Sequence, residues 1–194
     1  MGKCEVKMRK REGSRMNGQY LIKSLVREKE IHETYKVASK EDVEKTENEL
    51  NCKLPKSYCD FVSQFSNGAF LYMIQEVSAV GDGNKQIVPI QRLSLKGMTS
   101  IETHEKINIR EGGSVNIDYL IPFSLDHNGN AWCFIVNQMI DEEYKVAYFD
   151  SHNPKLYGIM DNFNEWLKIL INNREEVIRI LYDDNVISME IGLG

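Results

Sequence analysis

The chain has 194 residues, 42% of them hydrophobic and 27% charged, a composition typical of one globular domain that can bury a sizeable core. No apolar run approaches the roughly 18 residues that a membrane span needs. Residues 1–15 are basic but lack the apolar stretch of a secretory signal. We therefore expect a cytoplasmic protein that does not act in a membrane.

The four cysteines form no Cys-x-x-Cys pair, and the spacing of Cys52 and Cys59 is not a zinc spacing. Free thiols agree with a reducing compartment. We expect neither a bound metal nor another cofactor.

Charge is distributed unevenly along the chain. Residues 1–40 carry 11 Lys and Arg against 5 Asp and Glu, whereas residues 41–194 carry 13 against 24. The acidic body repels nucleic-acid phosphates and attracts basic proteins, because encounter rates follow the summed electrostatic field. The basic N-terminal arm lacks interleaved aromatic residues, so we expect no direct nucleic-acid binding.

A first amphipathic helix is predicted over residues 18–32. Tyr20, Leu21, Leu25 and Ile31 lie near one face of such a helix, with basic side chains elsewhere. We expect this face to pack against the rest of the domain.

Residues 39–68 predict two short helices that meet at Leu54-Pro55. Ser39 and Asp42 have the spacing of a capping box at the start of the first helix. Asn51 stands where this helix would end, at a position that tolerates a left-handed residue. Proline suits the first turn of the second helix, because its missing N–H would have no partner there anyway.

The second helix of this pair carries a one-sided apolar stripe. Its members Tyr58, Phe61, Val62 and Phe65 are spaced at i, i+3, i+4 and i+7. Asn67-Gly68 then ends the helix and turns the chain. The pattern predicts a helical pair that closes a hydrophobic core.

Strand patterns follow this pair. Ala69–Val77 is short, apolar and aromatic, and Ile87–Ile90 predicts a brief strand that Pro89 interrupts. Residues 93–113 are weakly patterned and predict a variable loop, with local helix around Thr103–Ile107.

The clearest strands are three runs rich in β-branched and aromatic residues. They are Ile117–Leu125, Ala131–Asn137 and Tyr144–Phe149. Asn128-Gly129 between the first two is a strong hairpin signal, because both residues accept a positive φ. A meander of antiparallel strands is therefore expected, covered by helices on at least one face.

The C-terminal part returns to helix. An apolar stripe predicts a helix from about Asp161 to Asn172, and Arg174–Tyr182 and Val186–Ile191 predict further helix and a last strand. The fold class is therefore α+β, with N-terminal helices and a C-terminal helix packed on an antiparallel, meander-like sheet.

The helical pair and its flanks resemble the opening signature of the SUKH superfamily. This signature is an acidic first helix, a short turn, Leu-Pro, an aromatic helix and then Asn-Gly. The residues that carry the resemblance are Glu49-Leu50, Leu54-Pro55, Tyr58, Phe61 and Asn67-Gly68. Later segments that also resemble the superfamily are Ile121-Pro122, Asp126 to Asn130, Val146 to Asp150, and the helix around Phe163 and Trp166. Asn51 and Ala69 depart from the glycines that are frequent at these places.

The resemblance covers roughly residues 35–170 and implies a function as well as a fold. It divides the chain into a basic arm with the first helix (1–34) and a SUKH-like domain (35–194) within one compact unit. The group contains bacterial immunity proteins that neutralise polymorphic toxins, and yeast regulators of cell-wall assembly. It implies a non-enzymatic protein that binds and sterically blocks a basic toxin domain, such as a nuclease. A regulatory interaction scaffold is the alternative within the same group.

Six carboxylates in loops beside the predicted sheet are candidates for an acidic partner-binding face. They are Asp118, Asp126, Asp141, Glu142, Glu143 and Asp150. Charge at such a face would speed capture, while a few aromatic anchors would carry most of the affinity. The alternative interpretation is a solvated acidic rim without a partner.

A metal-dependent hydrolase is the enzymatic alternative. Asp126, His127, Asp150 and His152 form two Asp/His clusters at the ends of neighbouring predicted strands, and these residue types bind divalent metals or act as acid and base. All four lie in turn-forming sequences, where Asp is also favoured for capping the backbone. We therefore predict no catalytic residue and no metal ligand.

Overall fold

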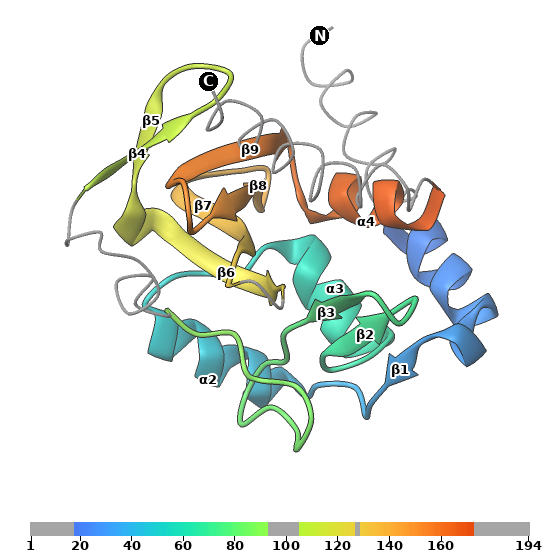
Figure 1. The fold of residues 1–194 in the computed structure, drawn as a ribbon. Helices are drawn as coiled ribbons and strands as arrows, with labels where there is room; N and C mark the ends of the chain where they lie inside the picture. The colour runs from blue at the N-terminus through green and yellow to red at the C-terminus, as the bar shows by residue number, and fades with distance from the viewer. Residues whose placement is uncertain (1–17, 93–104, 127–128, 173–194) are drawn as a thin grey trace, which may run out of the picture.

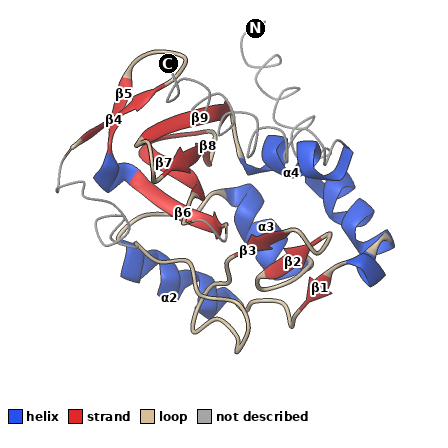
Figure 2. Cartoon of the chain, in the orientation of Figure 1, coloured by secondary structure: helices blue, strands red, loops and turns tan. Residues whose placement is uncertain are grey.

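The computed structural model describes residues 18–92, 105–126 and 129–172, which form helices gathered around two sheets (Figures 1 and 2). The helical segments are residues 18–27, η1 (Lys29–Ile31), α2 (Lys40–Leu50), α3 (Lys56–Gln64), η3 (Ile117–Tyr119) and α4 (Phe163–Asn172). The strands are β1 (Glu33–Thr34), β2 (Ala69–Leu71), β3 (Gln75–Val77), β4 (Lys106–Ile109), β5 (Ser114–Asn116), β6 (Leu120–Leu125), β7 (Ala131–Ile140), β8 (Glu143–Asp150) and β9 (Lys155–Met160). The predicted α+β class is confirmed.

The first helix is shorter than predicted, and its buried face is different. Leu21 and Leu25 are buried as expected, but Tyr20 is 61% exposed and Ile31 is 43% exposed. Ile22 takes their place in the core. The helix ends before η1, so Ile31 lies in a 3₁₀ turn, whose tighter winding takes its side chain off the face of the helix.

The predicted helical pair is confirmed. The Ser39 hydroxyl accepts the N–H of Asp42, and the Asp42 carboxylate accepts the N–H of Ser39, which completes the capping box of α2. Asn51 adopts the left-handed conformation with φ 51°. Pro55 stands directly before α3. The buried hydrophobic residues of α3 and its C-cap are the predicted Tyr58, Phe61, Val62 and Phe65.

The three-stranded sheet has the order β1-β2-β3. The strand character predicted over Ala69–Val77 is confirmed, and Tyr72 and Met73 turn the chain with φ 52° and 58° so that the segment forms the hairpin β2–β3. The brief strand predicted over Ile87–Ile90 is reduced to one isolated bridge between Ala79 and Pro89. Proline has no N–H to extend such a ladder.

Asn67 and Gly68 stabilise the turn that follows α3. The Asn67 side chain donates to the Val80 carbonyl at 3.1 Å and accepts the Val80 N–H at 2.7 Å, so it pairs with the backbone as a strand would. Gly68 follows with φ +77°, and a Cβ at this position would lie 2.7 Å from Cγ2 of Ile87. Both the backbone conformation and the space therefore require glycine.

We expect Gly68→Ala to lower the free energy of unfolding by about 2–4 kcal/mol, the sum of left-handed strain and overpacking. The matched control is Gly113→Ala, because Gly113 has φ +87° but nothing within 4 Å of the added Cβ. The control isolates the strain, which costs about 1–2 kcal/mol. Urea unfolding of both variants measures the difference, and equal losses would show that the contact with Ile87 is unimportant.

The larger sheet has the order β5-β4-β9-β8-β7-β6. Strands β6 to β8 form the predicted antiparallel meander, and β9, which was not predicted, extends it. The loop predicted over residues 93–113 is wrong over β4, which pairs with β9 in parallel. The first three residues of the strand predicted over Ile117–Leu125 form η3 instead. The polar and apolar residues of β4 alternate, but a run of four residues is too short to be recognised as a strand.

Chain connectivity requires this sheet to curl. Strands β5 and β6 occupy its two edges, yet only the three residues of η3 connect them (Figure 2). Five inter-strand spacings in a flat sheet would separate these edges by about 24 Å. Three residues cannot reach across this distance. The sheet therefore bends until its edges approach one another.

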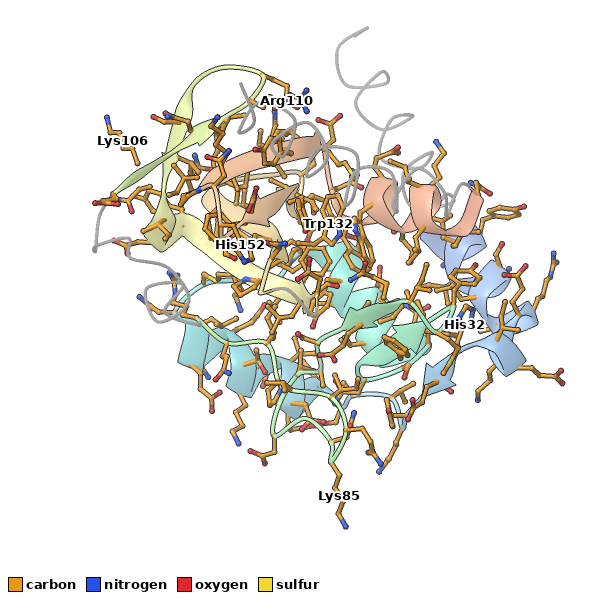
Figure 3. All side chains as sticks on the ribbon, viewed as in Figure 1. His32, Lys85, Lys106, Arg110, Trp132 and His152 are labelled. Carbon is orange, nitrogen blue, oxygen red and sulfur yellow. The ribbon has the colours of Figure 1, made fainter. Side chains whose placement is uncertain are left out.

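The curl creates two hydrophobic clusters, one on each face of the sheet. The inner cluster consists of Ile107, Val115, Ile117, Leu120, Ala131, Cys133, Ile135, Ala147, Phe149 and Leu156. The outer cluster joins the sheet to the helices, and Trp132 lies in it near α4 (Figure 3). It includes Leu21, Ile22 and Leu25, so the first helix shares the core of the domain.

Three predicted elements lie wholly or partly outside the described residues. The helix predicted over Arg174–Tyr182, the strand over Val186–Ile191 and the start of Thr103–Ile107 lie outside the described residues. Among the helices that the structure describes, none is long and apolar enough to cross a membrane.

Candidate partner-binding surface

A groove of about 800 Å³ opens where four parts of the chain meet: the first helix, one face of α3 from Lys56 to Gln64, the β7–β8 hairpin and the start of α4. Most of the residues that line it have polar or charged side chains. The residues that line it, among those described, are Gly18, Gln19, Ile22, Lys56, Ser57, Asp60, Gln64, Gln138, Ile140, Asp141, Glu142, Glu143, Lys145, Asp161, Asn162 and Asn164. Three of the six predicted carboxylates are in this set.

The tip of the β7–β8 hairpin forms one rim of the groove. Asp141 and Glu142 are exposed there and adopt φ 51° and 67°. Two successive positive φ values define a type I′ turn, which normally takes Asn-Gly because other side chains are strained in it. The strand leading into the turn exposes two apolar side chains, Met139 at 36% and Ile140 at 55%. The rim therefore presents acidic and apolar groups side by side.

Glu143 connects the β7–β8 hairpin to α3 by hydrogen bonds. Its carboxylate accepts the backbone N–H of Ser57 at 2.8 Å and the Ser57 hydroxyl at 2.6 Å. The Glu142 carbonyl accepts the N–H of Lys56 at 2.9 Å. The first N–H groups of a helix need acceptors, and Pro55 at the N-cap has no side chain that can serve. Glu143 therefore caps α3 from the other side of the domain and holds the turn in place.

The groove is acidic. Five carboxylates line it (Asp60, Asp141, Glu142, Glu143 and Asp161) against two lysines, Lys56 and Lys145. Lys56 is already paired with Asp60, at 2.5 and 2.6 Å from its two oxygens. Burial raises the pKa of Glu143, although the hydrogen bonds from Ser57 oppose this shift. A negative potential inside a concave surface favours a cationic ligand.

The raised pKa of Glu143 predicts a pH dependence of stability. The folded state binds the Glu143 proton more tightly than the unfolded state, so this contribution is greatest below the ordinary pKa of 4.5 and is lost as the pH rises through the raised value. We expect the wild type to gain stability relative to Glu143→Gln as the pH falls from about 7 to 4. Denaturant unfolding of both proteins across this pH range measures the difference in their free energies of unfolding.

Ser57→Ala serves as the companion variant. Because it removes a hydrogen bond that favours the charged carboxylate, the pH-dependent difference should widen. A difference between wild type and Glu143→Gln that is constant over the range would contradict the prediction.

The other three predicted carboxylates lie elsewhere. Asp118 is half-buried in η3, where its carbonyl accepts from Arg92 at 2.6 Å. Asp126 accepts from the Tyr148 hydroxyl at 2.8 Å and from the Asn130 N–H at 2.9 Å. Asp150 is only 6% exposed. The six residues therefore do not form one surface, because the β6–β7 and β8–β9 turns stand at the end of the meander opposite the β7–β8 turn.

Asp126 and Asp150 both have turn-capping roles. One Asp150 oxygen accepts the N–H groups of His152 and Asn153, at 2.9 and 3.1 Å. The ring nitrogen Nδ1 of His152, labelled in Figure 3, lies 4.0 Å from this carboxylate. The His152 side chain is mostly exposed. His127 lies outside the described residues. In the parts of the chain that the structure describes, no group of three or more His, Cys, Asp or Glu side chains is placed to hold a metal ion.

The groove itself was missed by sequence reasoning. Asp60 lies in α3 and Asp161 lies just before α4, so neither belongs to the loops that carry the six predicted carboxylates. One signal was present: a helix that begins after Pro55 with Lys56-Ser57 lacks a local N-cap side chain and needs an acceptor from elsewhere.

The fold and this surface define an α+β domain with a curled sheet and an acidic groove beside its helical pair. A family model described as SMI1 / KNR4 family (SUKH-1) matches residues 37–169, which is more than half of the chain. The chain therefore belongs to this family, as its resemblance to the SUKH superfamily predicts. No curated protein sequence matches the chain at a significant level.

Proposed function

We propose that this protein is an immunity protein that binds a toxin domain and blocks it sterically, in the bacterial cytoplasm and without catalysis or cofactor. Proteins of its family are generally immunity or regulatory proteins, which supports the class of function. The observation that carries the choice of surface is the acidic groove, with Asp141, Glu142 and the apolar Ile140 exposed at its rim. A basic toxin domain, such as a nuclease, has the complementary charge.

The rim suits recognition because it is held rigid. The contacts of Glu142 and Glu143 with the start of α3 position the turn before a partner arrives, so little conformational entropy is lost on binding. An exposed isoleucine beside carboxylates resembles the composition of interfaces in which an apolar anchor supplies affinity and charge supplies speed.

The test is co-expression with toxin domains encoded in the same genome. We expect one of them to co-purify with this protein in a 1:1 complex, and we expect cells that express this toxin to survive when the protein is present. A regulatory scaffold would bind its partner without abolishing activity. Neutralisation by far less than one equivalent would instead indicate turnover and overturn the proposal.

A further inference from the structure

We propose that the acidic groove is the docking site of this chain's own basic N-terminal segment, residues 1–17. Residues 1–17 contain six Lys and Arg against two Asp and Glu, a net charge of +4. The groove has the opposite balance, with five carboxylates and two lysines. The two charge distributions are therefore complementary.

The point of attachment favours this occupant over a separate molecule. Residues 1–17 lie outside the described residues, but Gly18, to which they are joined, itself lines the groove. A chain of 17 residues can reach at most about 60 Å. A tethered segment of this length has an effective concentration in the millimolar range, so even a weak interaction is substantially populated.

The pattern of the segment also matches the mixed character of the rim. Val6 and Met8 alternate with Lys7 and Arg9. Alternating residues of an extended chain point to opposite sides, so apolar and basic side chains can be presented separately. The rim offers the exposed Ile140 next to Asp141 and Glu142.

Because the interaction is between exposed charges, added salt should release the segment.

Carbodiimide crosslinking of the full chain tests the proposal without any partner. We expect amide crosslinks between Lys7 or Lys10 and the Asp141 or Glu142 carboxylates, with a yield that falls about threefold or more between 20 and 500 mM NaCl. Mixed ¹⁴N- and ¹⁵N-labelled protein distinguishes crosslinks within one molecule from those between two. The exposed carboxylate of Glu41 on α2 serves as the internal control.

Crosslinks to Glu41 as frequent as those to the groove, or crosslinks found only between molecules, would overturn the proposal. A second measurement uses a full-length variant with Arg9→Glu, Lys10→Glu and Arg11→Glu. Docking predicts that the NMR amide signals of Ser57 and Glu142 shift in this variant, and unchanged signals would also overturn it. Groove crosslinks without toxin neutralisation would refute the proposed function alone, and neutralisation without groove crosslinks would refute this inference alone.

Discussion

Replacing Phe163 with alanine is expected to lower the free energy of unfolding by about 3–5 kcal/mol, the usual cost of truncating a buried aromatic residue. Phe163 is fully buried at the start of α4. Its ring centroid lies 5.5 Å from that of Tyr58 in α3 and 5.4 Å from that of Phe123 in β6, and it stacks on Trp166 at 5.3 Å. The residue therefore joins two helices to the sheet.

Two matched variants make this expectation specific. Tyr20→Ala removes an aromatic side chain that is 61% exposed, so its effect should stay within about 0.5 kcal/mol. Phe163→Leu keeps most of the volume and should cost clearly less than the alanine variant. Urea unfolding followed by tryptophan fluorescence and by circular dichroism measures all three. A loss of less than about 1.5 kcal/mol for Phe163→Ala would mean that the aromatic cluster does not organise the core.

The second large effect concerns recognition. Asp141→Asn combined with Glu142→Gly removes both charges from the rim of the groove, and we expect association with the partner toxin to slow about tenfold at low salt. Asn-Gly is also the preferred sequence for a turn with two positive φ values, such as the φ 51° and 67° found here. The folded state should therefore lose no stability while recognition is weakened.

Slower association without a loss of stability would exclude a simple unfolding artefact. The control is Glu41→Gln combined with Glu49→Gln, which changes the net charge equally at two exposed positions on α2. Stopped-flow association rates at several salt concentrations, together with unfolding curves, provide the comparison. If the control slows association as much as the rim variant, total charge governs capture and the groove has no special role.

Much of the fold was predictable because its signals are local. The capping box at Ser39 and Asp42, the left-handed Asn51 and the buried stripe of α3 each depend on residues a few positions apart. The strands β6 to β8 were recognisable because β-branched and aromatic residues are concentrated in them. The strands that were missed, β4 and β9, include short or polar segments whose conformation depends on their neighbours in the sheet.

The candidate site was predictable only in part. Asp141, Glu142 and Glu143 were recognised as loop carboxylates and do line the groove, whereas Asp150 occupies a buried, turn-capping position. Composition identifies an acidic residue but does not reveal whether it faces solvent or satisfies the backbone. An exposed carboxylate can contribute to a binding surface, whereas one that accepts backbone hydrogen bonds stabilises the fold.

The amino-acid sequence by itself determined the helical pair, the Asn67-Gly68 turn, the strand-rich middle and the acidic body, because these depend on side-chain type and spacing along the chain. Only the tertiary structure decided which carboxylates meet in one groove and how they are held. Ser57 and Glu143 are 86 residues apart, and they come together because the packing of the helices against the sheet places the start of α3 beside the β7–β8 turn. Contacts of this range depend on packing, and no local pattern encodes them.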